Sequence, residues 1–281
     1  MRIANVNNRL CMIAAGVAVD VHDASDGRFS PDAAEVYERW DELVEWTAAG
    51  VDAPGVPYDL SAVGAPSPRP RQVFGIGANY ADHIAEAGIE APKKPAIFTK
   101  FPTCLCGPAA DVMLPSDRAD WEVELVAVIG RRAEHVAPED AWGYLAGLTV
   151  GQDISERRVQ FQKPIMQLDL GKSFPTFGPT GPELVTIDEL DDPGDLPITC
   201  HLNGEPMQSS RTSNLIFDVP TLVSYISHHV TMLPGDVLFT GTPDGVGSTR
   251  EPKRFLQPGD VIDSHIEGVG SMRNLCVERK D

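Results

Sequence analysis

Two glutamates separated by one residue stand in an apolar stretch of the chain. Glu122 and Glu124 flank Val123 within the segment Asp120–Gly130 (DWEVELVAVIG). Side chains alternate between the two faces of a β-strand, so a strand here places both carboxylates on one face. Ionised carboxylates held side by side repel each other, and a divalent cation between them is the simplest way to relieve that repulsion. The alternative is an edge strand whose outer face is solvated.

A third acidic residue follows another apolar stretch. Asp153 comes after Tyr144–Val150, and Arg157 and Gln160 follow it in the chain. Residues four and seven positions apart lie on one face of a helix, so a helix here would bring these three side chains together. A solvated helix face with an ordinary ion pair is the other interpretation of this segment.

A histidine and a glutamate could form a general-base pair. His83 and Glu86 are three residues apart within the short predicted helix 79–88, so they lie on one helix face. A carboxylate beside an imidazole fixes its tautomer and raises its basicity. The alternative is a polar pair on an exposed helix face.

Two glycine-containing segments could approach a ligand closely. Lys172 follows Gly171 in a predicted turn, and the loop Gly241–Gly247 (GTPDGVG) follows an apolar strand. The loop lacks the G-K-[ST] ending of a P-loop. It could bring backbone N–H groups and Thr242 to a ligand carboxylate, although either segment could also be a plain turn. The segment 75–79 lacks the third glycine and the βαβ unit of a dinucleotide-binding fold.

Composition excludes several classes of partner. The 281 residues include 23 lysines and arginines against 41 aspartates and glutamates, a formal net charge of −18, which opposes binding to nucleic acid or anionic membranes. Five cysteines form neither a C-x-x-C pair nor an even disulfide framework, which indicates a reducing compartment. No segment has the features of a signal peptide, and no apolar run reaches membrane length. We therefore expect a soluble cytoplasmic protein.

The start of the chain has the pattern of a small α+β unit. Arg2–Val6 and Leu10–Val21 have strand-like patterns. Residues 31–49 form a predicted helix with Ser30 as its cap and a proline at its first position.

Alternating prolines indicate a domain boundary. They run from Pro66 to Pro70, and beyond them short apolar strands alternate with glycine- and proline-containing turns. A further helix is predicted over Asp218–His228, with its first residue as the cap. We predict a small N-terminal domain over residues 1–66 and a catalytic domain over residues 67–281.

The order and spacing of these motifs resemble those of the fumarylacetoacetate hydrolase family, over Arg71–Val277. The resemblance implies an α+β, β-rich fold, a mixed β-roll or sandwich-like barrel with a small N-terminal domain, usually assembled as a homodimer. The matching segments are Asn79…His83…Glu86, Asp120–Leu125, Asp153…Ser155…Arg157…Gln160, Gly171–Phe174 and Gly241–Gly247.

The resemblance also implies a metal site. Glu122, Glu124 and Asp153 would bind Mg²⁺ or Mn²⁺. Three carboxylates without a cysteine or histidine ligand form a hard, oxygen-only site, which suits such cations better than zinc. An octahedral ion with three protein ligands leaves positions for waters and for two oxygens of a 2-oxo acid.

On the same resemblance, other residues would bind and transform the substrate. Arg157, Gln160, Lys172 and Thr242 would hold the 2-oxo carboxylate end. Lys172 would also stabilise enolate charge as a C–C bond breaks.

A lid and a supporting lysine complete the implied site. His83 with Glu86 would activate water for attack on a distal carbonyl, and Lys100 would support the metal carboxylates. The chain departs from the usual family pattern at Glu156 and Arg158. We expect Arg158 to face solvent, although it could instead recognise a second substrate carboxylate.

The sequence thus predicts a metal-dependent hydrolase that cleaves a C–C bond of an acylpyruvate-type 2-oxo acid, with decarboxylation of oxaloacetate as a second expected activity. An isomerase or hydratase of an unsaturated oxo-dioate in aromatic catabolism is an alternative. A non-catalytic, metal-stabilised dimer is another, but a purely structural site needs none of His83, Glu86 and Lys172. The expected partners are a small 2-oxo acid and a second copy of the chain, with no nucleic acid and no membrane.

Overall fold

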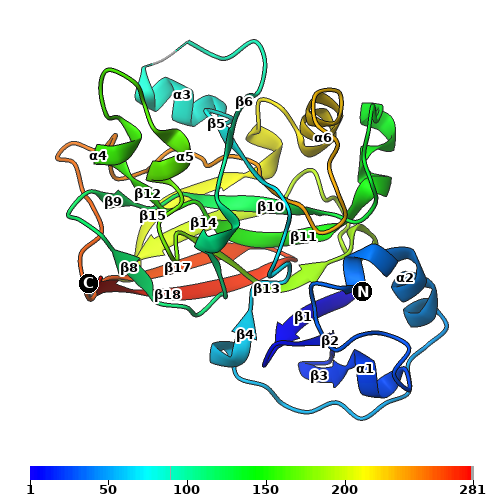
Figure 1. Ribbon diagram of the computed structural model, residues 1–281. Helices are drawn as coiled ribbons and strands as arrows, with labels where there is room; N and C mark the ends of the chain where they lie inside the picture. Colours follow the sequence, from blue (N-terminus) through cyan, green and yellow to red (C-terminus); the bar gives the residue numbers. More distant parts are fainter. Residues whose placement is uncertain (89, 280–281) are drawn as a thin grey trace.

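Two β-sheets form the framework of the molecule (Figure 1). The computed structural model describes residues 1–88 and 90–279. The larger sheet has eleven strands, in the order β3–β2–β1–β13–β11–β10–β16–β5–β6, with β4 paired to β1 and β7 paired to β13. The smaller sheet has five strands, in the order β15–β14–β17–β18–β8, and β9 and β12 form a separate pair.

The strands of the larger sheet are β1 (Arg2–Val6), β2 (Arg9–Ala14), β3 (Val17–Asp20), β4 (Val63–Gly64), β5 (Val73–Gly77), β6 (Ala96–Thr99), β7 (Leu105–Cys106), β10 (Val123–Ile129), β11 (Leu145–Gln152), β13 (Gly178–Val185) and β16 (Val237–Phe239). Those of the smaller sheet are β8 (Val112–Leu114), β14 (Pro197–Leu202), β15 (Glu205–Arg211), β17 (Val261–Ile266) and β18 (Gly270–Glu278), and the separate pair is β9 (Ala119–Asp120) with β12 (Ser155–Glu156).

The α-helices are short: α1 (Val21–Ala24), α2 (Trp40–Ala48), α3 (Ala81–Ala87), α4 (Arg157–Gln160), α5 (Leu168–Gly171) and α6 (Val219–Ser227). The 3₁₀ helices are η1 (Val36–Arg39), η2 (Leu60–Ala62), η3 (Pro102–Cys104), η4 (Pro138–Tyr144), η5 (Ile187–Glu189) and η6 (Thr212–Asn214). None of the helices in the described ranges is long and apolar enough to cross a membrane.

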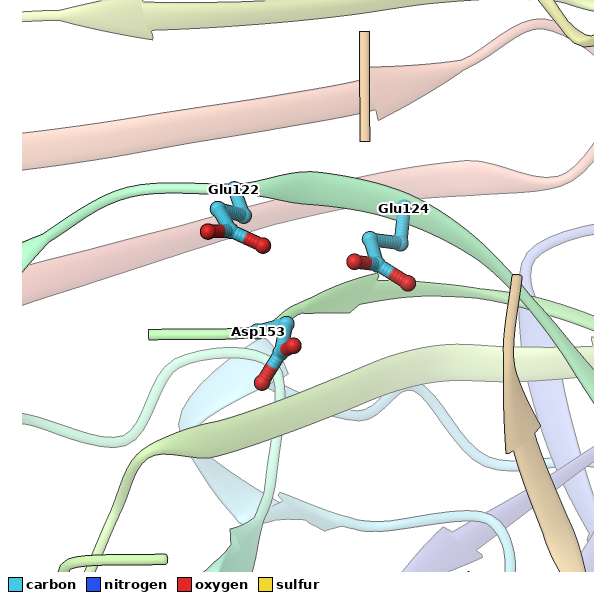
Figure 2. Close-up of side chains that lie close together, drawn as sticks. All are labelled: Glu122, Glu124 and Asp153. Carbon is cyan, nitrogen blue, oxygen red and sulfur yellow. The ribbon is translucent and has the colours of Figure 1, made fainter. Parts of the chain in front are cut away.

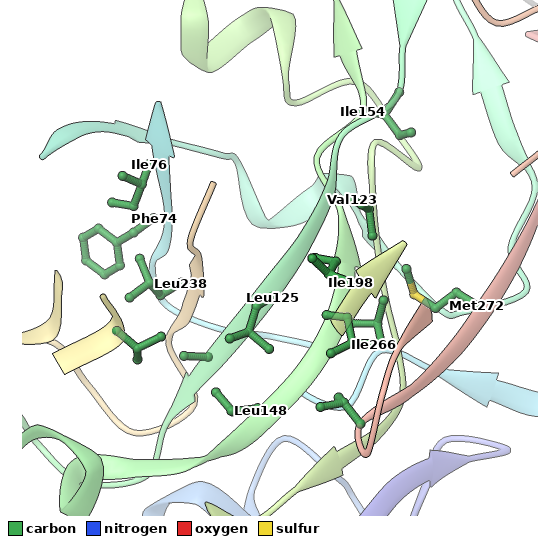
Figure 3. Close-up of a cluster of buried hydrophobic side chains, with 14 of the residues drawn as sticks. Phe74, Ile76, Val123, Leu125, Leu148, Ile154, Ile198, Leu238, Ile266 and Met272 are labelled. Carbon is green, nitrogen blue, oxygen red and sulfur yellow. The ribbon is translucent and has the colours of Figure 1, made fainter. Parts of the chain in front are cut away.

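Strand β10 is buried on both faces, in the middle of the larger sheet. One face carries Val123 and Leu125 and packs into the core between the two sheets (Figure 3). The other face carries Val126 and Val128 and packs into a second core. The run of β-branched and apolar residues explains this placement, because a strand covered on both faces needs apolar side chains on both. The alternative of a solvated edge strand is therefore wrong.

The N-terminal segment covers the outer face of the larger sheet. Phe29, Tyr37, Trp40 and Leu43 belong to the second core, together with the outer residues of β10. Strand β1 pairs antiparallel with β13, so this segment also extends the sheet. The division into domains at residue 66 stays a prediction.

Two N-terminal predictions need correction. The segment 10–21 contains two strands, because the chain turns at Ala15 and Gly16, both with positive φ. The predicted helix over 31–49 begins only with η1 and α2. Ser30 accepts a hydrogen bond from the N–H of Asp32 at 3.2 Å, so it stabilises a local turn that precedes the helices.

The predicted bounds of the later helices agree better with the structure. Helix α6 begins as predicted, because Asp218 accepts a hydrogen bond from the N–H of Thr221 at 2.9 Å. Helix α3 falls within the predicted range. The helix proposed over 153–160 is wrong in its first part, because Asp153 lies in the turn after β11 and α4 begins only at Arg157.

Candidate active site

Three carboxylates meet at one end of β10. Glu122 directly precedes the strand, Glu124 lies in it, and Asp153 follows the neighbouring strand β11. All three are buried, and one carboxylate oxygen of each lies within 4.8 Å of the others. Figure 2 shows both glutamates pointing from the strand toward Asp153. The backbone N–H of Asp153 donates to the carbonyl of Glu122 at 2.9 Å, which fixes the turn against β10.

Two buried lysines donate hydrogen bonds to carboxylate oxygens of Glu122 and Asp153. The Nζ of Lys172 donates to Glu122 Oε2 at 2.7 Å and to Asp153 Oδ2 at 2.5 Å. The Nζ of Lys100 donates to Asp153 Oδ1 at 2.6 Å and to the carbonyl of Phe177 at 3.2 Å. Burial by itself lowers the pKa of Lys172, but Asp153 and Glu122 raise it above its ordinary value. The Lys172 side chain is therefore a charged hydrogen-bond donor and not a base.

An arginine holds the other side of Glu122. The Nη1 of Arg157 contacts Glu122 Oε1 at 2.6 Å and donates to Gln160 Oε1 at 2.8 Å. Burial by itself raises the pKa of Glu122, but Lys172 and Arg157 lower it below its ordinary value. The structure thus places Arg157 beside the triad and Gln160 beside Arg157.

Glu124 is the least compensated member of the triad. Within the part of the chain that the structure describes, its carboxylate accepts one hydrogen bond, from the N–H of Gly241 at 2.7 Å. Burial raises its pKa well above the ordinary value, and the charges of Asp153 and Glu122 raise it further. Such a carboxylate needs a cation when it is ionised. An all-oxygen donor set with surplus negative charge fits a divalent cation such as Mg²⁺ or Mn²⁺.

Two polar atoms near the triad have no hydrogen-bond partner among the described residues. They are the hydroxyl of Tyr80 and Nδ1 of His83, and both are buried. Burial raises the pKa of Tyr80, and the charge of Glu124 adds to the rise, so this hydroxyl lies within the electrostatic reach of the triad. A bound ligand could satisfy such groups.

The predicted pair on α3 is close but not hydrogen-bonded. His83 Nδ1 lies 3.7 Å from Glu86 Oε2, beyond hydrogen-bond range. The same Glu86 oxygen accepts a hydrogen bond from the N–H of Gly245 at 3.1 Å. A protonated His83 ring would still lower the pKa of Glu122, after the larger effects described above. Asn79 fixes the start of α3, because its amide donates to the carbonyl of Thr240 at 2.7 Å.

Thr242 reaches the site but is tied to the strand. Its hydroxyl donates to the carbonyl of Val123 at 2.9 Å and accepts from Gln208 at 2.9 Å. Gln208 Oε1 in turn accepts the N–H of Val123 at 3.0 Å, and Gln152 Oε1 accepts the N–H of Glu122 at 2.9 Å. Sequence analysis missed these two glutamines because no local pattern marks them.

The two departures from the family pattern have structural explanations. Arg158 is exposed and pairs with Asp117 at 2.7 Å, in agreement with the expectation that it faces solvent. Glu156 caps α4, because it accepts the N–H of Val159 at 2.5 Å.

Taken together, the site can bind an anion beside a divalent cation and offer hydrogen bonds to it. It contains four carboxylates and three cationic side chains, so one formal negative charge is left over when all of them are ionised. They are Asp120, Glu122, Glu124, Asp153, Lys100, Arg157 and Lys172.

Known proteins are similar to this chain in sequence and in fold. Residues 72–277 match the sequence model of the fumarylacetoacetate (FAA) hydrolase C-terminal family. The mitochondrial oxaloacetate tautomerase FAHD2A of Bos taurus is 43% identical over 232 residues, which cover 82% of this chain and 74% of that protein.

Several solved structures cover the whole chain, and two of them differ in their similarity to it. A Mycobacterium smegmatis protein provisionally described as HpcE is 47% identical, with a TM-score of 0.95 and full coverage of both chains. The maleylpyruvate hydrolase of Sphingobium sp. SYK-6, solved with manganese(II) and pyruvate, is 26% identical, with a TM-score of 0.78 and full coverage of both chains. The β-rich fold predicted from the sequence is confirmed.

Proposed function

The chain belongs to the fumarylacetoacetate hydrolase family, and from this premise we propose that it is a divalent-metal-dependent enzyme that enolises a 2-oxo acid. The reaction we favour is keto–enol tautomerisation of oxaloacetate or a similar 2-oxo dicarboxylate. The relative that is 43% identical over most of the chain is named as an oxaloacetate tautomerase, which supports this choice.

The observation that carries the proposal is the buried pairing of cations with the acidic triad. Lys172 and Arg157 contact opposite oxygens of Glu122, and both are buried. Donors fixed in a dry site stabilise developing negative charge without reorganising. A 2-oxo acid that becomes an enolate gains charge on its 2-oxygen, which is the change that such donors favour.

The proposal assigns the triad to metal binding and its neighbours to substrate binding. Glu122, Glu124 and Asp153 would hold the divalent cation, which would supply Lewis-acid polarisation of the 2-oxo group. Arg157 and Gln160 would bind the adjacent carboxylate.

His83 is the proposed proton carrier. The ring would take the proton from C3 of the keto form as the C2–C3 double bond forms. The protonated ring then donates this proton to the 2-oxygen to give the enol, so no atoms are gained or lost and the ring returns to its neutral form. An imidazole suits this step because its pKa lies near neutrality. Among the described residues, Nδ1 of His83 has no hydrogen-bond partner that would compete with the substrate.

The test is the metal-dependent loss of the oxaloacetate enol, followed by its ultraviolet absorbance. Mn²⁺ without protein controls for the spontaneous reaction, and EDTA is expected to remove the enzymatic rate. We expect His83→Ala to lower the rate by about 100-fold or more with Mn²⁺ affinity nearly unchanged. His229→Ala, at the exposed end of α6, is the matched control. Equal loss of rate and Mn²⁺ affinity would place His83 among the metal ligands and contradict the proposal.

C–C hydrolysis of an acylpyruvate is the second candidate. His83 beside Glu86 could instead activate water, and the maleylpyruvate hydrolase structure holds manganese and pyruvate. Metal-dependent pyruvate release from acetylpyruvate or fumarylpyruvate, without tautomerase activity, would favour it. The homodimer and the cytoplasmic location stay predictions.

A further inference from the structure

Asp120 is a fully buried carboxylate beside the site. Its Oδ1 accepts the N–H groups of Trp121 at 2.9 Å and Gly247 at 2.7 Å. Its Oδ2 accepts the N–H of Ser248 at 2.9 Å and Arg157 Nε at 2.8 Å, and Arg157 Nη2 forms an ion pair with it at 2.7 Å. An ionised carboxylate offers about four acceptor positions. Four hydrogen bonds therefore fill this group, and Asp120 cannot itself bind metal or substrate.

Asp120 sets the direction of the Arg157 guanidinium. Nε and Nη2 of Arg157 face Asp120. Nη1 forms an ion pair with Glu122 and donates a hydrogen bond to Gln160. A guanidinium has five N–H groups in a rigid plane. Two N–H groups donate hydrogen bonds to described residues, from Nε to Asp120 and from Nη1 to Gln160. Nη2 and Nη1 also lie within ion-pair distance of Asp120 and Glu122, so the guanidinium keeps further N–H groups for a ligand.

Asp120 also fixes the glycine-rich loop. Gly247 and Ser248 donate their N–H groups to it, and a Cβ at Gly247 would lie 2.7 Å from Asp120 Oδ1. Two residues earlier, Gly245 donates its N–H to Glu86 on α3. One carboxylate therefore fixes both the arginine of the site and the loop that contacts the α3 helix.

We propose that Asp120 is a positioning residue that aims Arg157 at the carboxylate of the 2-oxo acid and holds the loop 245–248 against the same arginine. This inference rests on the proposed function, because it assigns the substrate carboxylate to Arg157. Asp120 itself contacts neither metal nor substrate, and its effect on the substrate carboxylate is exerted through Arg157.

The test is binding of oxalate, a rigid mimic of the 2-oxo carboxylate end, to the full chain saturated with Mg²⁺. Isothermal titration calorimetry would compare the parent protein with Asp120→Asn, Arg157→Gln and the double variant. We expect each single variant to weaken oxalate about 10- to 100-fold, as for loss of a charged hydrogen bond. The double variant is expected to bind oxalate no more weakly than Arg157→Gln alone, because Asp120 acts through Arg157.

Two measurements separate positioning from general destabilisation. Asp236→Asn is the matched control, because Asp236 is also fully buried and accepts three hydrogen bonds, from Gln72 and Leu233. It is expected to lower thermal stability but leave oxalate affinity unchanged. Mn²⁺ affinity of Asp120→Asn is expected to change by a smaller factor than oxalate affinity.

Several other results would contradict the inference. Additive losses in the double variant, or unchanged oxalate affinity in Asp120→Asn, would overturn it while leaving the proposed function intact. If the parent protein binds no oxalate in the presence of Mg²⁺, the proposed function fails and this inference fails with it. If Asp120→Asn does not fold, Asp120→Glu keeps the charge but displaces Arg157, and unchanged oxalate affinity in that variant would overturn the inference.

Discussion

Charged pairs are buried around Glu122 but partly exposed in the N-terminal segment. Around Glu122, the cations Lys100, Lys172 and Arg157 are buried and contact their acids at 2.5–2.8 Å. In the N-terminal segment, by contrast, the side chain of Arg9 is 41% exposed and that of its partner Asp20 is 23% exposed. Removing one member of a buried pair leaves an uncompensated charge, whereas an exposed charge is rehydrated. The buried cluster is therefore interdependent, and the surface pair is dispensable.

The change from charged to apolar occurs along one face of one strand. Glu122 and Glu124 are followed on the same face by Val126 and Val128, which belong to the second core. The triad therefore borders the apolar interior. This position strengthens each electrostatic contact and raises the penalty for an unpaired charge.

The sharpest way to break the buried cluster is to neutralise a carboxylate that serves several partners. Asp153→Asn removes a proposed metal ligand and weakens the contacts to both Lys100 and Lys172. We expect metal-dependent turnover to fall by about 1000-fold, equivalent to ~4 kcal/mol of lost transition-state stabilisation. Steady-state rates and Mn²⁺ titration calorimetry would measure this. The exposed Asp191→Asn should behave as the parent protein, and an active Asp153→Asn would refute the metal assignment.

A lysine variant tests the interdependence through stability. Lys100→Met leaves Asp153, a fully buried carboxylate, with one cation instead of two. We expect the free energy of unfolding to fall by about 3–5 kcal/mol, as for other broken buried pairs. Urea denaturation in EDTA measures it, with the exposed Lys253→Met as control. A loss as small as that of the control would mean that the buried charges are not interdependent.

The sequence predicts which residues form the buried charged cluster, but it does not predict the long-range hydrogen bonds that support them. Glu122 and Glu124 are found because strand periodicity is a local property of the chain. Gln208 is 85 residues from Val123, whose N–H it accepts, and such a contact leaves no local periodic signal. Asp120 stands inside a recognised motif, but its role depends on Gly247 and Arg157, which tertiary folding brings to it.

The same limit explains the errors in secondary structure. The spacing of Asp153 and Arg157 fits a helix, yet Asp153 lies between β11 and β12, where its N–H is bonded to the carbonyl of Glu122. In the N-terminal segment the proline at position 31 suits a helix start, but the helices begin later, where Tyr37 and Trp40 pack into the second core. Tertiary contacts overrode the local preference in both places.

The surface pair gives the smallest expected effect and completes the comparison. Arg9 Nη2 donates to Asp20 Oδ1 at 3.0 Å across β2 and β3. A double-mutant cycle with Arg9→Gln and Asp20→Asn should give a coupling below about 1 kcal/mol, decreasing with added salt. Burial by itself raises the pKa of Asp20, but Arg9 and the N–H of Asp23 lower it below its ordinary value.

An acid with a lowered folded-state pKa contributes stability above its unfolded pKa, about 3.9 for aspartate, and loses it as pH falls through the folded value. The coupling should therefore be present at pH 7 and disappear in strongly acidic solution, which urea denaturation across pH would show. A coupling as large as the loss in Lys100→Met, or one that survives molar salt, would mean that exposure does not separate the two classes of charge. The interdependence of the site would then need another cause than burial.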